Sequence, residues 1–214
     1  MKLEWIGHAC FMMTAQDGTA VITDPYDESV GIDMVPLQAD LITMSHEHHD
    51  HNETSMIVGR PVIAHGCEEA QAGSVTAKAV SSWHDDAQGA KRGSNAIRIF
   101  DIDGMKIVHM GDQGCMPDEE AIAAIADADV MMIPVGGTYT VDAQGAKAII
   151  ERAKPRCVIP MHVKTKRCPY PIERADNFLK AMNAQNAAPV DVLEMTKETV
   201  PCGVVLMNPM TDEL

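Results

Sequence analysis

The chain has 214 residues, 46% of them hydrophobic, and a formal net charge of −14 at pH 7. This length and apolar content suffice for one large domain, residues 1–214, and no stretch approaches the ~20 apolar residues of a membrane span. Acidic residues outnumber basic ones 31 to 17, which argues against a protein that binds nucleic-acid phosphates.

The first half of the chain is predicted to consist of short strands. The expected strands span residues 2–7, 10–14, 19–23, 40–45, 74–82, 95–102 and 105–110. Asp17-Gly18 separates two of the early strands, and Asp103-Gly104 supplies a two-residue turn between the last two.

Helices alternate with strands in the second half. Pro117 and the acidic residues after it are typical of a helix N-terminus, and Asp142 is expected to cap a second helix. The buried positions fall at helical spacing: Ile122, Ile125 and Ala126 in the first helix, Ala146, Ile149, Ile150 and Ala153 in the second, and Ala175, Phe178, Leu179 and Met182 in a third. Further strands are expected near residues 129–134, 156–160, 190–195 and 202–208.

The most informative segment is His46-Glu47-His48-His49-Asp50-His51, which directly follows the apolar run Leu41–Met44. Neutral imidazole and carboxylate groups are ligands of Zn²⁺, Mn²⁺ and Fe²⁺, and this segment holds more donors than one tetrahedral ion can use. A histidine-rich surface loop or a tag is the alternative, but tags lie at termini and lack the interleaved acids. We therefore expect two divalent metal ions.

The spacing within this segment suggests how the ligands divide. A thermolysin-like His-Glu-x-x-His helix is excluded, because Asp50 occupies the position four residues after His46. In a chain leaving a strand, His46 and His48 point the same way and can share one ion. Asp50 and His51 follow the turn and can reach a second ion.

Five further motifs accompany this segment in the chain. They are Asp24-Pro25, Trp83-His84-Asp85-Asp86, His109-Met110-Gly111-Asp112, Pro134-Val135-Gly136-Gly137 and Pro160-Met161-His162. Together they resemble the metallo-β-lactamase superfamily, and among its branches the metal-dependent hydrolases related to L-ascorbate-6-phosphate lactonase. The resemblance implies an α/β fold, the four-layer αββα sandwich with helices outside two sheets and metal ligands at strand ends.

The resemblance also implies the metal ligands. It assigns His46, His48 and His84 to the first ion, Asp50, His51 and His162 to the second, and Asp112 to a bridging position. The residues agree with this assignment, because the ligands beyond the cluster each follow an apolar, β-rich run whose end can aim them at a common point.

Several nearby residues have two possible roles. His8 matches a family position near the site, where it could support a ligand. Asp24 could orient a ligand histidine by accepting its free N–H, or cap a turn before Pro25. Cys115 could line the site or be a buried structural thiol. His65 and His109 match no ligand position and are expected to be structural.

Three cations, Lys164, Lys166 and Arg167, follow His162 closely. They could bind an anionic group of a substrate, or they could be solvated residues of a loop.

The expected function is a metal-dependent hydrolase for a small, anionic ester or lactone, its small-molecule partner. Two ions would lower the pKa of a bridging water toward ~7, and the resulting hydroxide would attack while Asp50 and Asp112 orient it. Zn²⁺ or Mn²⁺ are the expected ions, with Fe possible. The N-terminus lacks the features of a signal peptide and the six cysteines form no Cys-x-x-Cys pair, so we expect a cytoplasmic protein with no membrane or nucleic-acid partner.

Other functions share the same ligands. A phosphodiesterase or ribonuclease is disfavoured by the acidic balance and by the lack of room for an appended arm. An oxygen-reducing di-iron protein would carry Glu in place of His48. The zinc β-lactamases place Cys or His on the second metal, rather than a residue like Asp112. A non-catalytic metal-binding protein remains open, because ligands alone do not prove turnover. The sequence leaves the oligomeric state unknown.

Overall fold

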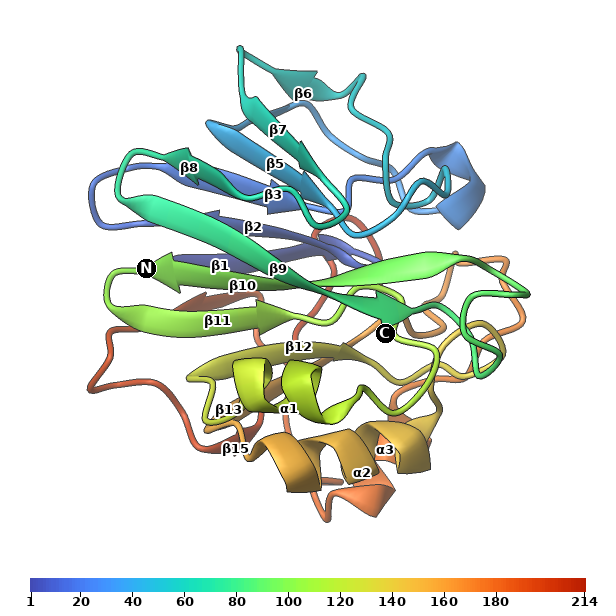
Figure 1. Ribbon diagram of the computed structural model, residues 1–214. Helices are drawn as coiled ribbons and strands as arrows, with labels where there is room; N and C mark the ends of the chain where they lie inside the picture. The colour runs from blue at the N-terminus through green and yellow to red at the C-terminus, as the bar shows by residue number, and fades with distance from the viewer.

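Two β-sheets organise the computed structural model, which describes residues 1–214 (Figure 1). The first sheet has six strands in the order β14 (Val192–Glu194), β1 (Lys2–Gly7), β2 (Cys10–Thr14), β3 (Ala20–Thr23), β5 (Leu41–Met44) and β7 (Val62–His65). The second has seven, in the order β15 (Gly203–Val204), β13 (Cys157–Met161), β12 (Val130–Pro134), β11 (Met105–His109), β10 (Ser94–Ile102), β9 (Val75–Trp83) and β8 (Ala70–Ala72). A separate parallel pair is formed by β4 (Leu37–Gln38) and β6 (Ile57–Val58).

Local sequence signals explain the connections in the second sheet. Ile102 pairs with Met105 across Asp103-Gly104, whose φ angles of 53° and 72° are those of a two-residue hairpin turn. β9 and β10 are antiparallel and leave the loop 84–93 between them, since Trp83 pairs with Ser94. β11, β12 and β13 are parallel, so each connection crosses over through a helix.

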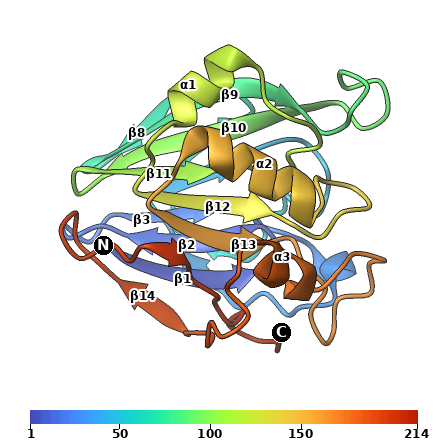
Figure 2. The same cartoon turned by 90° about the horizontal axis from the view of Figure 1, so that it is seen from below.

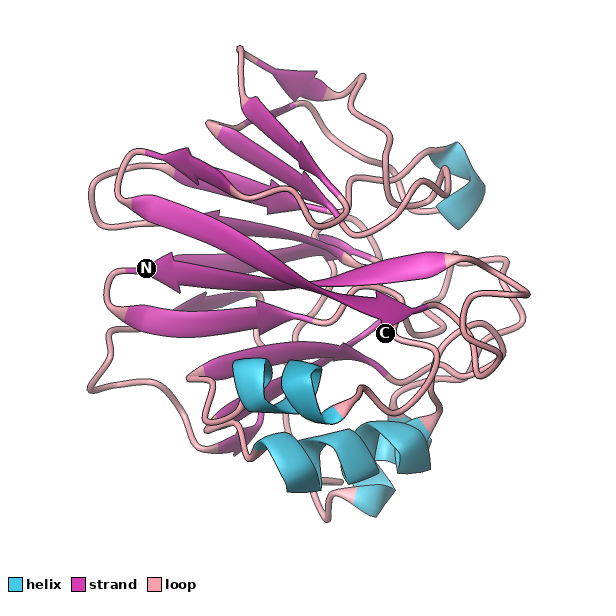
Figure 3. Ribbon diagram, viewed as in Figure 1, coloured by secondary structure: helices cyan, strands magenta, loops and turns pink.

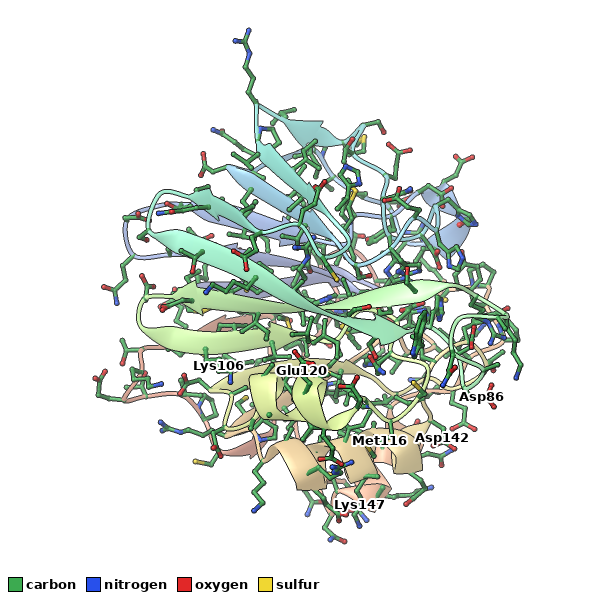
Figure 4. The ribbon with its side chains drawn as sticks, viewed as in Figure 1. Asp86, Lys106, Met116, Glu120, Asp142 and Lys147 are labelled. Carbon is green, nitrogen blue, oxygen red and sulfur yellow. The ribbon has the colours of Figure 1, made fainter.

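The helices α1 (Glu119–Ile125), α2 (Ala143–Ala153) and α3 (Asp176–Ala181) lie together on one side of the second sheet (Figures 2 and 3). Asp118 caps α1 by accepting the amide of Ala121 at 2.8 Å. Asp142, at the start of α2 in Figure 4, accepts the amides of Gln144 and Gly145 at 3.0 and 2.8 Å. No helix has the length and apolar character that crossing a membrane would require.

Apolar side chains fill the space between the sheets and under the helices. This main core includes Trp5, Phe11, Phe100 and Phe178, all essentially inaccessible to solvent. A second, smaller core covers the other face of the first sheet and includes Tyr26. The layer over that face is formed by the short 3-10 helix η1 (Glu28–Val30), the strand pair β4 and β6, and loops, so one outer layer of the expected sandwich contains no α-helix.

The predicted strands and helices are present with ends shifted by a few residues, except that the strand expected near 202–208 is reduced to the two residues of β15. The sequence did not predict η1, β4, β6, β7 and β8, because these elements are only two to four residues long. β7 also exposes both Val62 and Ile63, so it lacks the alternation that marks a half-buried strand. Ala175 and Met182 are cap residues of α3 rather than helical positions, and Ala126 is the C-cap of α1.

The strand ends determine where a site can form. β5, β9, β11 and β13 end at the same edge of the paired sheets, on the right of Figure 1. The segments that follow these four strands carry the histidine-rich loop, His84, Asp112 and His162.

Candidate metal centre

The first predicted ligand group, His46, His48 and His84, is brought together by β5 and β9. One ring nitrogen from each of the three lies within 4.8 Å of the others. His46 Nε2 is 3.0 Å from His48 Nδ1, and the ring of His84 has its centroid 4.8 Å from that of His46. These nitrogens therefore face a common point.

The second predicted group, Asp50, His51 and His162, forms a separate cluster that also includes His8. Asp50 Oδ2 lies 3.8 Å from His51 Nε2 and 3.3 Å from His8 Nε2. The ring of His8 lies 4.0 Å from that of His162, centroid to centroid. His8 thus adjoins this cluster directly.

Asp112 stands between the two groups. Its Oδ2 atom lies 3.1 Å from His84 Nε2, and 3.3 Å from the Nε2 atoms of both His51 and His162. Two ligands bound to one tetrahedral ion at ~2.1 Å are about 3.4 Å apart, so these separations suit shared coordination. One carboxylate oxygen therefore contacts both predicted groups, as a bridging ligand would.

The donor set fits divalent metal ions. His51 Nε2 and Asp112 Oδ1 are buried and have no hydrogen-bond partner. A buried polar atom without a partner is costly, and a coordinated cation would satisfy both atoms. The mixture of imidazole and carboxylate suits zinc, manganese or iron better than calcium or magnesium.

Asp24 orients His51 from behind. Its Oδ2 atom lies 2.9 Å from His51 Nδ1, and both side chains are fully buried. The same carboxylate accepts the backbone N–H of Ser45 at 2.8 Å and its hydroxyl at 2.6 Å. Of the two roles considered for Asp24, the geometry supports the orientation of a ligand histidine, which directs the Nε2 lone pair into the site.

Burial and neighbouring charges determine the protonation of these groups. Burial lowers the pKa of His46 to about 3 and that of His8 to about 4. Burial also acts to lower the pKa of His51, but the carboxylates of Asp112 and Asp24 raise it well above its ordinary value. The two carboxylates thus favour positive charge at His51, and a bound cation can supply that charge in place of a proton.

The two predicted catalytic carboxylates are ionised at neutral pH. Burial acts to raise the pKa of Asp112, but the charges of His162 and His51 bring it well below its ordinary value. Burial has the same effect on Asp50, and the hydrogen bond with His8 reverses it, so the pKa of Asp50 is also lowered. Both groups therefore have the charge that a metal ligand needs.

Three residues at the site have a strained backbone conformation. His8, Asp24 and His162 have positive φ angles of 53°, 40° and 52°. Non-glycine residues rarely adopt this left-handed conformation, which typically persists at functional sites where the surrounding structure enforces it. The backbone N–H of His162 donates to the carbonyl of His8 at 3.0 Å, and so links two of these strained positions.

Two glycines allow the ligand-bearing segments to pack closely. A Cβ at Gly114 would lie 2.2 Å from the carbonyl carbon of His84, and one at Gly136 would lie 2.2 Å from the carbonyl oxygen of His162. Gly136 belongs to the motif Pro134-Val135-Gly136-Gly137 noted in the sequence, and this close approach explains why the position needs a glycine.

Asn95 supports Asp112 and was not found from the sequence. Its Oδ1 atom accepts the backbone N–H of Asp112 at 3.0 Å, and its Nδ2 donates to the carbonyl of Met110 at 2.9 Å. The side chain is buried in the strand next to β11. No local motif marks it, because the contact depends on the pairing of β10 with β11.

The predicted substrate-binding cations do not reach the site. Lys164 Nζ donates to the carbonyl of Tyr170 at 2.8 Å. Lys166 pairs with Glu213 at 3.0 Å, and Arg167 pairs with Asp33 at 2.7 Å. Of the two roles considered for these cations, the contacts favour loop residues over substrate binding, because the loop after His162 turns them toward other partners.

The remaining candidates lie outside the centre. His65 is exposed beside Glu47, and the Nε2 atom of buried His109 is 2.7 Å from the carbonyl oxygen of Ala9. Cys115 is half-buried and is not among the residues that line the cavity beside the metal ligands.

That cavity has a volume of about 380 Å³, which is in the range of small-molecule sites. It is lined by Ser29, His48, His49, Asp50, His84, Arg92, Asp112, Tyr139, His162 and Tyr170. Arg92, Tyr139 and Tyr170 were not predicted as site residues, since each lies on a loop and belongs to no ligand motif.

Comparison with known proteins agrees with this architecture. The family described as "Beta-lactamase superfamily domain" matches residues 2–162. The chain is 30% identical to a UPF0173 metal-dependent hydrolase of Archaeoglobus fulgidus, over 86% of this chain and 92% of the relative. A similar relative from Thermoplasma acidophilum is also 30% identical, over 77% of this chain and 84% of the relative.

Solved structures show the same fold. A Thermotoga maritima protein described as a proposed Zn-dependent hydrolase of the metallo-β-lactamase superfamily aligns with a TM-score of 0.80 and 30% identity, covering 96% of this chain and 97% of that one. Igni18, a metallo hydrolase from Ignicoccus hospitalis, aligns with a TM-score of 0.67 and 19% identity over 97% and 95% of the two chains, which shows a shared fold alone. The predicted fold class is therefore confirmed, and the chain belongs to the UPF0173 metal-dependent hydrolase family of the metallo-β-lactamase superfamily.

Proposed function

We propose that this protein is a hydrolase that binds two divalent metal ions and cleaves a small ester or lactone. The observation that carries the proposal is the position of Asp112, whose Oδ2 atom lies within 3.3 Å of histidine nitrogens from both ligand groups. His46, His48 and His84 would hold one ion, and Asp50, His51 and His162 the other. Zinc or manganese suits these donors, with iron as a further possibility.

When bound, such ions supply an activated water at neutral pH and polarise the scissile oxygen of the substrate. The protein supplies the orientation. Asp24 holds His51, and Asn95 holds the backbone of Asp112. Because Asp50 is ionised and lines the cavity, its free carboxylate oxygen can accept a hydrogen bond from the attacking water.

The neighbour of Asp50 is suited to support this role. With a pKa of about 4, His8 is neutral at pH 7, and its Nε2 lies 3.3 Å from Asp50 Oδ2. In the tautomer with the proton on Nε2, His8 donates to Asp50 and holds the carboxylate in place. His8 is therefore proposed as a positioning residue.

The substrate class is proposed from size and motif. A cavity of about 380 Å³ suits a small molecule, and the net charge of −14 opposes a polyanionic nucleic acid. The resemblance of the metal motifs to the lactonase branch favours a lactone among the possible esters.

The test begins with protein purified without added metal. Elemental analysis should find about two ions per chain, and a panel of lactones, carboxylic esters, thioesters and phosphodiesters should show turnover of lactones or esters. Asp112→Asn should abolish that turnover. Asp129→Asn, a matched change at a buried acid that pairs with Lys197 instead, should not. Turnover of phosphodiesters alone would replace the proposed substrate class, and metal binding without any turnover would support a non-catalytic metal protein.

A further inference from the structure

The loop 84–93 is held in one conformation by a buried acid that follows the ligand His84. Asp85 Oδ1 accepts the backbone N–H groups of Ala87 and Gly89 at 2.7 and 2.9 Å. Its Oδ2 accepts those of Lys91 and Arg92 at 2.9 and 2.7 Å. Four hydrogen bonds to one carboxylate fix the backbone from which the Arg92 side chain leaves.

Lys91 and Arg92, neighbours in this loop, have different surroundings. Lys91 pairs with Asp86 at 2.6 Å, and both side chains are mostly exposed. Asp86 lies at the edge of the molecule in Figure 4. Arg92 is half-buried and lines the cavity beside the metal ligands. Arg92 makes no ion pair, and its single side-chain hydrogen bond runs from Nη2 to the carbonyl of Thr138 at 3.3 Å.

The guanidinium of Arg92 is oriented by an aromatic ring. Its Cζ lies 5.5 Å from the centroid of Tyr139, within the range of a cation–π contact. One face is thus covered, while most of the five N–H donors of the guanidinium have no protein partner. Such a group is preorganised to receive an external acceptor.

Arg92 is also the only lysine or arginine among the residues that line the cavity. Tyr170, another residue of the lining, is neutral, and its hydroxyl lies 2.7 Å from Ser29 Oγ. The two acids of the lining, Asp50 and Asp112, are assigned to metal binding. A substrate anion would therefore find one positive side chain here that no acid of the protein neutralises.

We propose that Arg92 is the specificity-determining residue of the cavity and binds a carboxylate or phosphate group on the substrate. The inference rests on the proposed function, because it defines the substrate class of that same site. A guanidinium presents paired N–H donors that match the two oxygens of such a group. The anionic preference thus depends on Arg92, rather than on the cations that follow His162.

The kinetic test compares two esters of equal carbon count, 4-nitrophenyl hydrogen succinate and neutral 4-nitrophenyl butyrate, on metal-loaded protein. Arg92→Gln should raise the Michaelis constant for the succinate ester about tenfold or more and change that for the butyrate ester little. Arg92→Lys should retain part of the preference, because it keeps the charge without the paired geometry. Arg152→Gln, at an exposed arginine on α2 paired with Glu119, is the matched control and should change neither.

The binding test does not depend on turnover. Calorimetry would measure succinate, 3-phosphonopropanoate and neutral butyramide binding to metal-loaded wild type and Arg92→Gln, with metal content checked by elemental analysis. If Arg92→Gln selectively weakens the binding of succinate or of the phosphonate, the inference is supported and the preferred anion is identified. If no ester or lactone is hydrolysed but this selectivity is found, the proposed function fails and the role of Arg92 stands. If all three ligands weaken alike, or none changes, Arg92 only links the two loops and the inference is overturned.

Discussion

Replacement of Asp24 by asparagine is expected to weaken metal binding at the second position more than at the first. In the wild-type protein, Asp24 Oδ2 lies 2.9 Å from His51 Nδ1, and both groups are fully buried. The amide oxygen of the introduced asparagine can still accept the backbone N–H of Ser45, so its NH₂ group then faces His51. A donor opposite Nδ1 moves the histidine proton to Nε2, where it blocks the lone pair directed at the metal.

The expected loss of metal affinity at the second position follows from the loss of this supporting carboxylate. Removing such a partner of a metal-binding histidine typically weakens metal affinity about 10- to 100-fold, or roughly 1.4–2.7 kcal/mol. The first position should be affected less. His46 Nδ1 lies 2.9 Å from Ser45 Oγ, and it can still donate to that hydroxyl in the Asp24→Asn variant. Ser45→Ala removes this contact and should weaken the first position preferentially.

Metal titration against a competing chelator, with elemental analysis after dialysis, measures both affinities. Asp129→Asn is the control, because Asp129 is also buried and accepts a backbone N–H, that of Lys106 at 2.8 Å, away from the site. If Asp24→Asn lowers metal affinity equally at both positions, or at neither, the role of Asp24 in orienting His51 would be refuted.

Four other predictions follow from the same geometry. His48→Ala should empty the first metal position preferentially in a protein that otherwise holds about two ions, and elemental analysis that finds one ion or none in the wild type would contradict the ligand set. Chelation should lower Tm by roughly 5–10 °C, since free metal at 100 times its Kd adds about 2.7 kcal/mol to a fold of this size; an unchanged melting curve after verified metal removal would count against a buried site. Gly136→Ala places a Cβ 2.2 Å from the His162 carbonyl oxygen, so it should destabilise the protein by about 1–3 kcal/mol and weaken metal binding, whereas Gly18→Ala, with no atom within 4 Å, should leave metal affinity unchanged. Burial acts to raise the pKa of Asp85, but its backbone hydrogen bonds lower it to about 2. The ionised carboxylate therefore stabilises the fold above about pH 4, and this stabilisation is lost as the pH falls toward 2. In urea unfolding over that interval, the Asp85→Asn variant should lose less free energy of unfolding than the wild type, and equal losses would argue against this role.

Much of the candidate site could be predicted because its signals are local. The segment 46–51 combines ligand types that have few other uses at such density, directly after a buried strand. His84, Asp112 and His162 each follow a strand, and strand ends that share a sheet edge meet in space. The structure brings six of the predicted ligands into two adjoining groups with Asp112 between them, and it favours one of the two roles considered for Asp24.

The substrate-facing side of the cavity could not be predicted in the same way. Lys164 lies two residues from His162, yet its amino group donates to the carbonyl of Tyr170, while Arg92 reaches the cavity from a loop eight residues beyond His84. Sequence proximity to a ligand therefore failed as a guide, because the direction of a side chain on a loop depends on what the loop packs against. Asp85 determines that direction for Arg92 through hydrogen bonds that no spacing rule specifies.

The sequence by itself determined most of the strand and helix pattern, and it predicted the metal chemistry and the division of ligands within 46–51, because periodicity, turn residues and donor types act over a few neighbouring residues. Only the tertiary structure decided that loops and η1 cover the first sheet, that Asn95 supports Asp112, and that Arg92 is the cation of the cavity. These features depend on contacts between segments distant in the chain, and such contacts are specified by the packing of the whole fold rather than by any local pattern.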